Sequence, residues 1–180
     1  MQARGPLMIE HRLIERLLAR VGRELPHIEE AGRVDPRFID TVVDFVRVYA
    51  DRTHHGKEED ILFRQLAERP MSEQDKKVMA ELVSEHAFGR QTTQGLIDAN
   101  ERYRGGDQAS LEVIVARLKV LAEFYPQHIA KEDKVFFPAV RRYFTEQEDQ
   151  ALLQAFWEFD RRMIHEKYGA VVEALEGDRS

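Results

Sequence analysis

The sequence predicts an all-α protein, an up-and-down four-helix bundle with an additional C-terminal helix. Apolar residues recur at helical spacing over long stretches, and no segment alternates apolar and polar residues as a strand would. The 10 Gly and 6 Pro cluster between these stretches. We therefore expect a single domain over residues 1–180, with the bundle at about 7–144 and the extra helix at about 146–176.

Prolines mark the ends of the first two predicted helices. The first covers about 7–25 and is expected to stop near Pro26. Asp35-Pro36 begins the second, because an aspartate can cap a helix and proline is tolerated in the first turn. That helix is predicted to continue to about Ala67 and to end before Pro70.

The three later helices also carry start signals. Ser72 precedes the third, which is expected to end by Gly105-Gly106. Asp107 or Ser110 can begin the fourth, which runs to about residue 144. Residues 145–148 read Thr-Glu-Gln-Glu, a capping-box pattern that predicts the start of the fifth helix.

Composition excludes several classes of protein. The chain has no Cys, which excludes disulfides, thiolate metal sites and cysteine nucleophiles. Its net charge is −6 with mixed acidic and basic residues, so we expect no nucleic-acid partner. No apolar run approaches the ~20 residues of a membrane span, and the N-terminus does not resemble a signal peptide. The expectation is a cytoplasmic protein with no membrane partner.

An internal repeat carries most of the histidines. His54 to Phe63 aligns with His128 to Phe137 at an offset of 74 residues, and both copies contain His-x-x-x-Glu followed by large apolar residues. A shorter pair, Glu10-His11 and Glu85-His86, aligns at an offset of 75. The near-equal offsets indicate two related helical halves, which would bring equivalent positions together around a pseudo-twofold axis.

The spacing places each histidine beside a carboxylate. Residues four apart share one helix face, so His54/Glu58 and His128/Glu132 each form a pair on the apolar stripe. Burying two such pairs is costly unless a cation compensates the charge. A pair of metal ions bridged by carboxylates would do so, and imidazole with carboxylate and no thiolate suits iron best, then manganese or zinc.

The register of the first pair has an alternative. His55 and Glu59 are also four residues apart, on a face about 100° further round an α-helix. The match to the second copy favours His54/Glu58. His55 is then expected beside the site or on the surface, and Glu59 off the site face.

At this point the sequence resembles the hemerythrin-like family, also called the HHE cation-binding domain, over about residues 7–144. The residues that carry the resemblance are Glu10-His11, His54-x-x-x-Glu58 with Ile61-Leu62-Phe63, Glu85-His86, and His128-x-x-x-Glu132 with Phe136-Phe137-Pro138. The segments Glu10-His11-Arg12-Leu13-Ile14-Glu15-Arg16 and His165-Glu166-Lys167-Tyr168 resemble a bacterial subgroup with an extra C-terminal helix.

The resemblance implies an oxo- or hydroxo-bridged di-iron centre in a four-helix bundle. It implies as metal ligands the residues His11, His54, Glu58, His86, His128 and Glu132. Oxygen-carrying members have a further histidine where this chain has Arg90, which cannot replace a ligand. They also use an aspartate where Asp133 stands, so the role of Asp133 is open. We predict His165, on the fifth helix, as the substitute ligand, with a capping or surface role as the alternative.

Three classes of function follow from such a centre. The first is a protein that binds dioxygen, nitric oxide or peroxide. The second is a redox enzyme acting on peroxide or nitric oxide with an unknown redox partner, or a protein of iron–sulfur repair, although members of that group usually carry a Cys-bearing segment. The third is iron storage, or a structural role in which the metal neutralises buried carboxylates.

Overall fold

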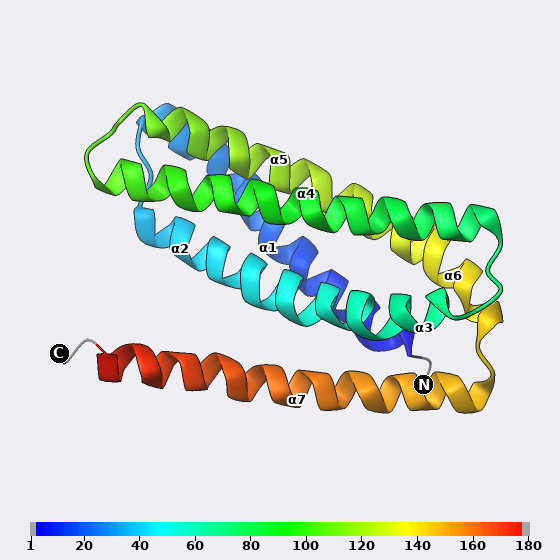
Figure 1. Cartoon of the computed structure of the whole chain (residues 1–180). Coiled ribbons are helices and arrows are strands. Elements are labelled where there is room, and N and C mark those ends of the chain that lie inside the picture. Colours follow the sequence, from blue (N-terminus) through cyan, green and yellow to red (C-terminus); the bar gives the residue numbers. More distant parts are fainter. Residues whose placement is uncertain (1–2, 178–180) are drawn as a thin grey trace.

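The computed structural model describes residues 3–177, with side chains to Gly169. Within this range every element is helical: α1 (Arg4–Ala31), α2 (Pro36–Asp44), η1 (Phe45–His55), η2 (Glu58–Phe63), α3 (Arg64–Ala67), α4 (Glu73–Arg104), α5 (Ser110–Lys131), η3 (Glu132–Phe136), α6 (Phe137–Val140), η4 (Arg141–Tyr143) and α7 (Glu146–Gly177). Segments α2 to α3 follow one another as a single long rod, which we call the second rod, and α5 to η4 form another, which we call the fourth rod. Together with α1 and α4, the first and third rods, they form an all-α bundle to which α7 is added (Figure 1).

The predicted helix starts are confirmed by their caps. The Asp35 side chain accepts a hydrogen bond from the backbone N–H of Arg37, and the Ser72 hydroxyl accepts one from that of Asp75. At the start of α7, Thr145 and Glu148 exchange hydrogen bonds between side chain and backbone in both directions. These bonds satisfy N–H groups that have no partner within the helix, which fixes where each helix begins.

The predicted end of the first helix is wrong. Helix α1 continues through Pro26 and ends at Ala31, where Gly32 adopts the left-handed conformation with φ of 60°. Its buried stripe continues to Leu25 and Ile28, so packing offsets the hydrogen bond that proline cannot donate. Glycine then ends the helix because it tolerates positive φ.

Both long rods change their winding where the histidines lie. Segments η1 and η2 in the second rod and η3 in the fourth are π-helical, with wider turns than an α-helix. The segments contain or adjoin the two His-x-x-x-Glu repeats. Such π segments are frequent at functional sites, and here they alter which side chains point inward.

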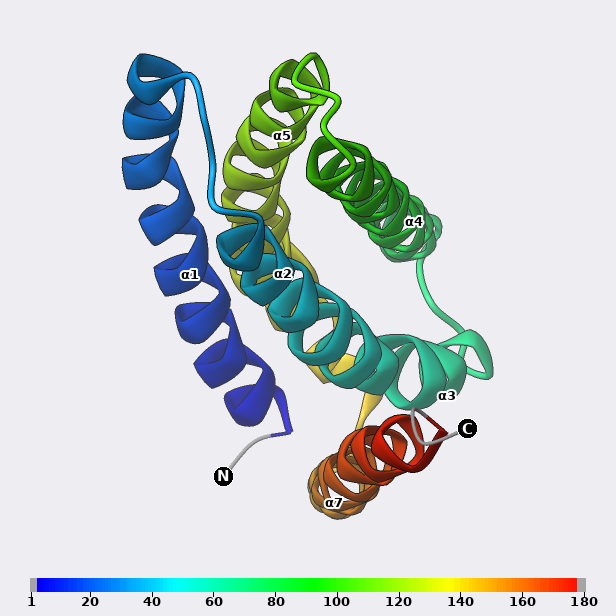
Figure 2. The ribbon, with the colours of Figure 1, turned by 90° about the vertical axis from the view of Figure 1, so that its left-hand side faces the viewer.

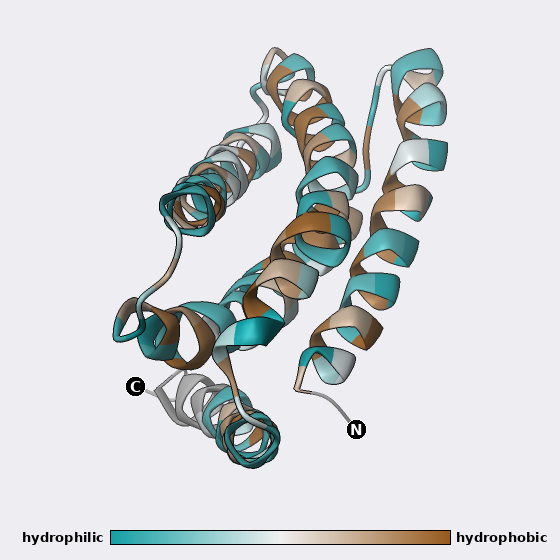
Figure 3. Ribbon diagram, turned by 90° about the vertical axis from the view of Figure 1, so that its right-hand side faces the viewer, coloured by the Kyte–Doolittle hydropathy of each residue, from teal (hydrophilic) through white to brown (hydrophobic). Residues whose placement is uncertain are grey.

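The apolar core is divided into two clusters by a polar layer. One cluster includes Ile14, Leu96 and Leu118 between α1, α4 and α5, and the other includes Leu7, Leu82 and residues of α7. Apolar colouring is concentrated on the inward sides of the helices (Figure 3). Between the clusters lie buried histidines and glutamates, so the centre of the bundle is polar.

Helix α7 packs along the second rod and closes one side of the bundle. It contacts η1 and η2, and Figures 1 and 2 both show it beside this rod. Its buried stripe is Leu152, Leu153, Phe156, Phe159 and Met163. Within the described residues, no helix has both the length and the apolar content that a membrane span requires.

Glycine at position 56 allows α7 to approach closely, which gives a first prediction. A Cβ on Gly56 would lie 2.7 Å from the ring of Phe159, whereas one on Gly22 would meet nothing within 4 Å. Gly56→Ala should lower the free energy of unfolding by about 1 kcal/mol, because overpacking costs ~1–3 kcal/mol and exceeds the gain in helix propensity. Gly22→Ala should instead raise it by ~0.5–1 kcal/mol. Urea unfolding of the metal-free variants measures both, and an equal gain in the two would contradict the close contact.

Candidate metal centre

Four helical rods each contribute to one buried cluster. His11 comes from α1, His54 and Glu58 from the second rod, His86 from α4, and His128 and Glu132 from the fourth rod. All six predicted residues are at most 2% exposed. The structure therefore brings these six together in the polar layer between the two apolar clusters.

A seventh side chain, His55, also lies in the cluster, which corrects the expectation that it lies beside the site or on the surface. His55 is 2% exposed, and its ring stacks on that of His86 with centroids 3.8 Å apart. In the π-helical η1 the angle between neighbouring side chains is smaller than the ~100° of an α-helix, so adjacent histidines can both face inward. The sequence carries one sign of this inward position. The repeat equivalent of His55 is the apolar Ile129, which is typical of a side chain that faces the interior.

The donor atoms form two groups. In one, atoms of His55, His86 and His128 all lie within 4.8 Å of one another. In the other, atoms of His11, His54, Glu58 and Glu132 do so. We call these the three-histidine half-site and the two-histidine half-site. Each has the spacing that one metal ion could span.

Glu58 and Glu132 lie between the half-sites. An oxygen of Glu58 is 3.7 Å from Nε2 of His54 and the other is 3.4 Å from Nε2 of His86. Glu132 reaches His11 at 3.1 Å with one oxygen and His128 at 3.3 Å with the other. Each carboxylate thus faces both half-sites, as a bridging ligand would.

Every histidine of the cluster has a carboxylate at its Nδ1. Glu10 accepts from His54 at 2.8 Å, Asp133 from His11 at 2.8 Å, Asp51 from His55 at 3.4 Å, Glu59 from His86 at 2.7 Å and Glu85 from His128 at 2.8 Å. An ionised carboxylate can only accept a hydrogen bond, so Nδ1 carries the proton. Nε2 then has a free electron pair, which it can present to a metal at the centre. This is the arrangement that orients histidines on metals.

These contacts show the hydrogen-bond partners of Glu59 and Asp133, the residues that follow Glu58 and Glu132. Asp133, whose role was open, holds His11. Glu59 was expected off the site face, but it holds His86. The positions are equivalent in the repeat, since Glu59 and Asp133 are 74 residues apart. The pseudo-twofold symmetry therefore extends beyond the cluster to the carboxylates around it.

The cluster contains polar atoms that no protein group satisfies. All four oxygens of Glu58 and Glu132, and Nε2 of His55, His86 and His128, are buried and make no hydrogen bond. The Nε2 atoms of His11 and His54 face each other at 2.9 Å. A buried group without a partner costs about 1–3 kcal/mol, so seven such atoms on five side chains at one point indicate a binding site. Nitrogen and oxygen donors of this kind fit a divalent or trivalent cation.

The buried carboxyl and imidazole groups shift one another's pKa values. Burial raises the pKa of Glu58 well above its ordinary value, and the charge of Glu132 raises it further. Burial opposes a charge on His11 and His86, but their carboxylate neighbours outweigh it and raise both pKa values to about 9. Burial lowers the pKa of His54 to about 4. Metal ions that bind here would displace protons from the same atoms.

Aromatic rings exclude water on several sides. Phe63 stacks on His86 with centroids 5.9 Å apart, and Phe137 stacks on His11 at 5.8 Å. These two phenylalanines are again 74 residues apart. Phe124 stacks on His128 at 5.5 Å. The site is a dry one, in which charges on a ligand or metal interact strongly.

The prediction that His165 is a ligand is not supported by the structure. His165 is exposed on α7 and belongs to neither half-site. It lies two residues beyond the buried Met163, which rotates it by about 200° around the helix, away from the bundle. Ile164 is one residue beyond Met163, about 100° around the helix, and is 58% exposed, so it does not anchor the helix. The histidine that joins the other four in the cluster is His55.

Arg90 stands where oxygen-carrying members of the family have a histidine ligand, and here it pairs with acids. Its guanidinium lies 2.8 Å from Asp51 and 3.1 Å from Glu59. These are the carboxylates that hold His55 and His86. One cation thus aligns the supports of two histidines in the three-histidine half-site.

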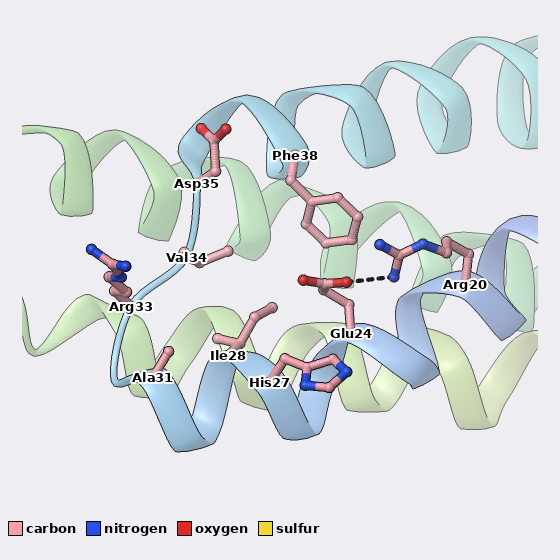
Figure 4. A pocket seen from close by; sticks show the side chains of 9 residues that line it. All are labelled: Arg20, Glu24, His27, Ile28, Ala31, Arg33, Val34, Asp35 and Phe38. Carbon is pink, nitrogen blue, oxygen red and sulfur yellow. Dashed lines mark ion pairs between the residues drawn. The ribbon is translucent and has the colours of Figure 1, made fainter.

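A surface pocket of about 520 Å³ lies elsewhere, between the end of α1 and the start of α2 (Figure 4). Its lining includes His27, Arg20 and Phe38. His27 is exposed and lies 16 residues beyond His11, which is about 24 Å along α1. This pocket is separate from the cluster.

The fold and the cluster define a helical-bundle metal-binding protein. The family model described as the Hemerythrin HHE cation binding domain matches residues 6–140, and the chain belongs to this family. No curated protein and no solved structure matches the chain. Helix α7 begins at Glu146, outside the matched range.

Replacement of His55 gives a second prediction. His55→Ala should weaken one bound metal by more than the ~10-fold typical of losing a residue that only supports a ligand. His165→Ala, the control, should leave metal binding unchanged. Chelator competition followed by metal analysis measures both. Weaker binding in His165→Ala together with unchanged binding in His55→Ala would restore the first assignment.

Proposed function

We propose that this chain holds two iron ions, one in each half-site, and binds dioxygen, nitric oxide or peroxide there. The observation that carries the proposal is the set of five histidines, each held at Nδ1 by a carboxylate, around two buried glutamates without protein partners. Manganese or zinc would fit the same donors less well.

The chain would hold the metals with unequal ligand sets. His55, His86 and His128 would serve one ion, and His11 and His54 the other, with Glu58 and Glu132 shared. With both glutamates shared, the two-histidine half-site has one histidine fewer, which favours it as the place where an outside ligand binds. A pair of iron ions bound here would supply redox-active positions for small oxygen and nitrogen ligands.

The surrounding residues would orient the donors and exclude water. The five outer carboxylates fix which nitrogen of each ring faces the centre, and Phe63, Phe124 and Phe137 cover the histidine rings. The two donor groups among the described residues would hold one ion each, which favours ligand chemistry over bulk iron storage. Redox turnover of peroxide or nitric oxide is the second candidate, favoured by the same unequal half-sites.

Iron content and absorption test this proposal. The metal-free chain, reconstituted with ferrous iron without oxygen, should hold two iron ions and develop charge-transfer bands when air is admitted. Return of the ferrous spectrum when oxygen is removed supports reversible binding, whereas catalytic loss of added peroxide or nitric oxide supports the enzyme. Glu58→Ala, which removes one shared carboxylate, should lose most of the iron. An iron content near zero in the unaltered chain would contradict the proposal.

A further inference from the structure

A buried lysine lies beside the cluster and is not among its metal-binding candidates. Lys57 follows His54 by three residues and precedes Glu58, and it is 0% exposed. Lysines are almost never fully buried unless they are paired, because an unpaired charge in a dry core is very costly. Lys57 therefore depends on the acids around its ammonium group.

Two acids from different helices meet this ammonium group. Lys57 donates to Glu10 on α1 and to Asp160 on α7, the latter at 2.6 Å. The other oxygen of Glu10 accepts the Nδ1 proton of His54 at 2.8 Å. These contacts form a continuous path from Asp160 through Lys57 and Glu10 to His54. The path joins α7 to the two-histidine half-site.

The opposite half of the molecule provides an internal comparison. Lys131 is the repeat equivalent of Lys57 and donates to Glu85, which holds His128. However, the side chain of Lys131 is 30% exposed, and its second acid is Glu81, on the same helix as Glu85. Among the residues with described side chains, both acids that pair with Lys131 belong to α4. The fifth helix thus adds an acid to the path at His54 and not to the one at His128.

We propose that α7 positions His54 through Asp160, Lys57 and Glu10, and thereby sets how tightly the two-histidine half-site holds its metal. The inference rests on the proposed two-metal centre. It assigns α7, which lies outside the residues matched by the family model, a role in the half-site that has fewer histidines. Asp160 and Lys57 are positioning residues, because they act on the metal only through Glu10 and His54.

Asp160 is partly exposed, so a substitution there can test the path without disturbing the core. Its side chain is 32% exposed, and it lines a groove of about 570 Å³ between η1 and α7, together with Glu10 and Tyr49. Asp160→Asn keeps the size of the side chain and removes its charge. Lys57 then keeps only Glu10 as an acidic partner. The apolar stripe of α7 is unchanged, so the variant should fold.

The experiment titrates the full-length metal-free chain with cobalt(II), whose absorption bands report on its ligands. The unaltered chain should bind two equivalents. In Asp160→Asn one equivalent should bind as before and the other about tenfold more weakly with shifted bands, as expected when the support of a ligand is disturbed. Lys57→Met should show the same change, and Asp160→Glu, which restores the carboxylate, should recover most of it.

Two control variants separate positioning from the general attachment of α7. Glu166→Gln removes an exposed ion pair of α7 with Arg52 and should leave both equivalents unchanged. Lys131→Met should not alter the equivalent that Asp160→Asn weakens. Unchanged cobalt binding in Asp160→Asn, or an equal loss of cobalt affinity in Glu166→Gln, would overturn only the proposed role of α7 and not the two-metal centre. Fewer than two equivalents in the unaltered chain would overturn the two-metal centre and this inference with it.

Discussion

The carboxylates of Glu58 and Glu132 place the strongest constraint on this protein, because both are 0% exposed and neither makes a hydrogen bond. Two carboxylates that face each other in a dry core are costly to ionise together, because each has lost its hydration, and the pKa of Glu58 is raised for this reason. Histidines on every side reduce this cost only while they hold protons. A pair of cations would remove it, which links metal binding directly to the stability of the bundle.

The same constraint explains the polar groups further out. A histidine that binds a metal must present one defined nitrogen, and each of the five has a carboxylate that fixes it. Those carboxylates in turn pair with cations, which are Arg12, Lys57, Arg90 and Lys131. From the centre outward, imidazoles are therefore followed by acids and then by bases. The apolar clusters on either side keep this arrangement dry.

The sequence predicted the fold class, the helix caps and six residues of the candidate site, because these depend on local chemistry or on the repeat. His54/Glu58 and His128/Glu132 follow from four-residue spacing, and their equivalence follows from the offset of 74. The inward position of His55 could not be predicted from α-helical geometry, because it depends on the π-helical winding of η1. His165 lies apart from the cluster because the buried stripe of α7 passes through Met163 and leaves His165 on the opposite side. The end of α1 was missed because tertiary packing outweighed the local effect of Pro26.

The central claim is that seven side chains form two adjacent metal sites, and anomalous X-ray scattering from crystals of the iron-loaded chain tests it most directly. The account predicts two peaks at the iron edge. One should be enclosed by His55, His86 and His128, and the other should lie beside His11 and His54, with Glu58 and Glu132 between them. A single peak, or iron bound at His165 in place of His55, would contradict the account.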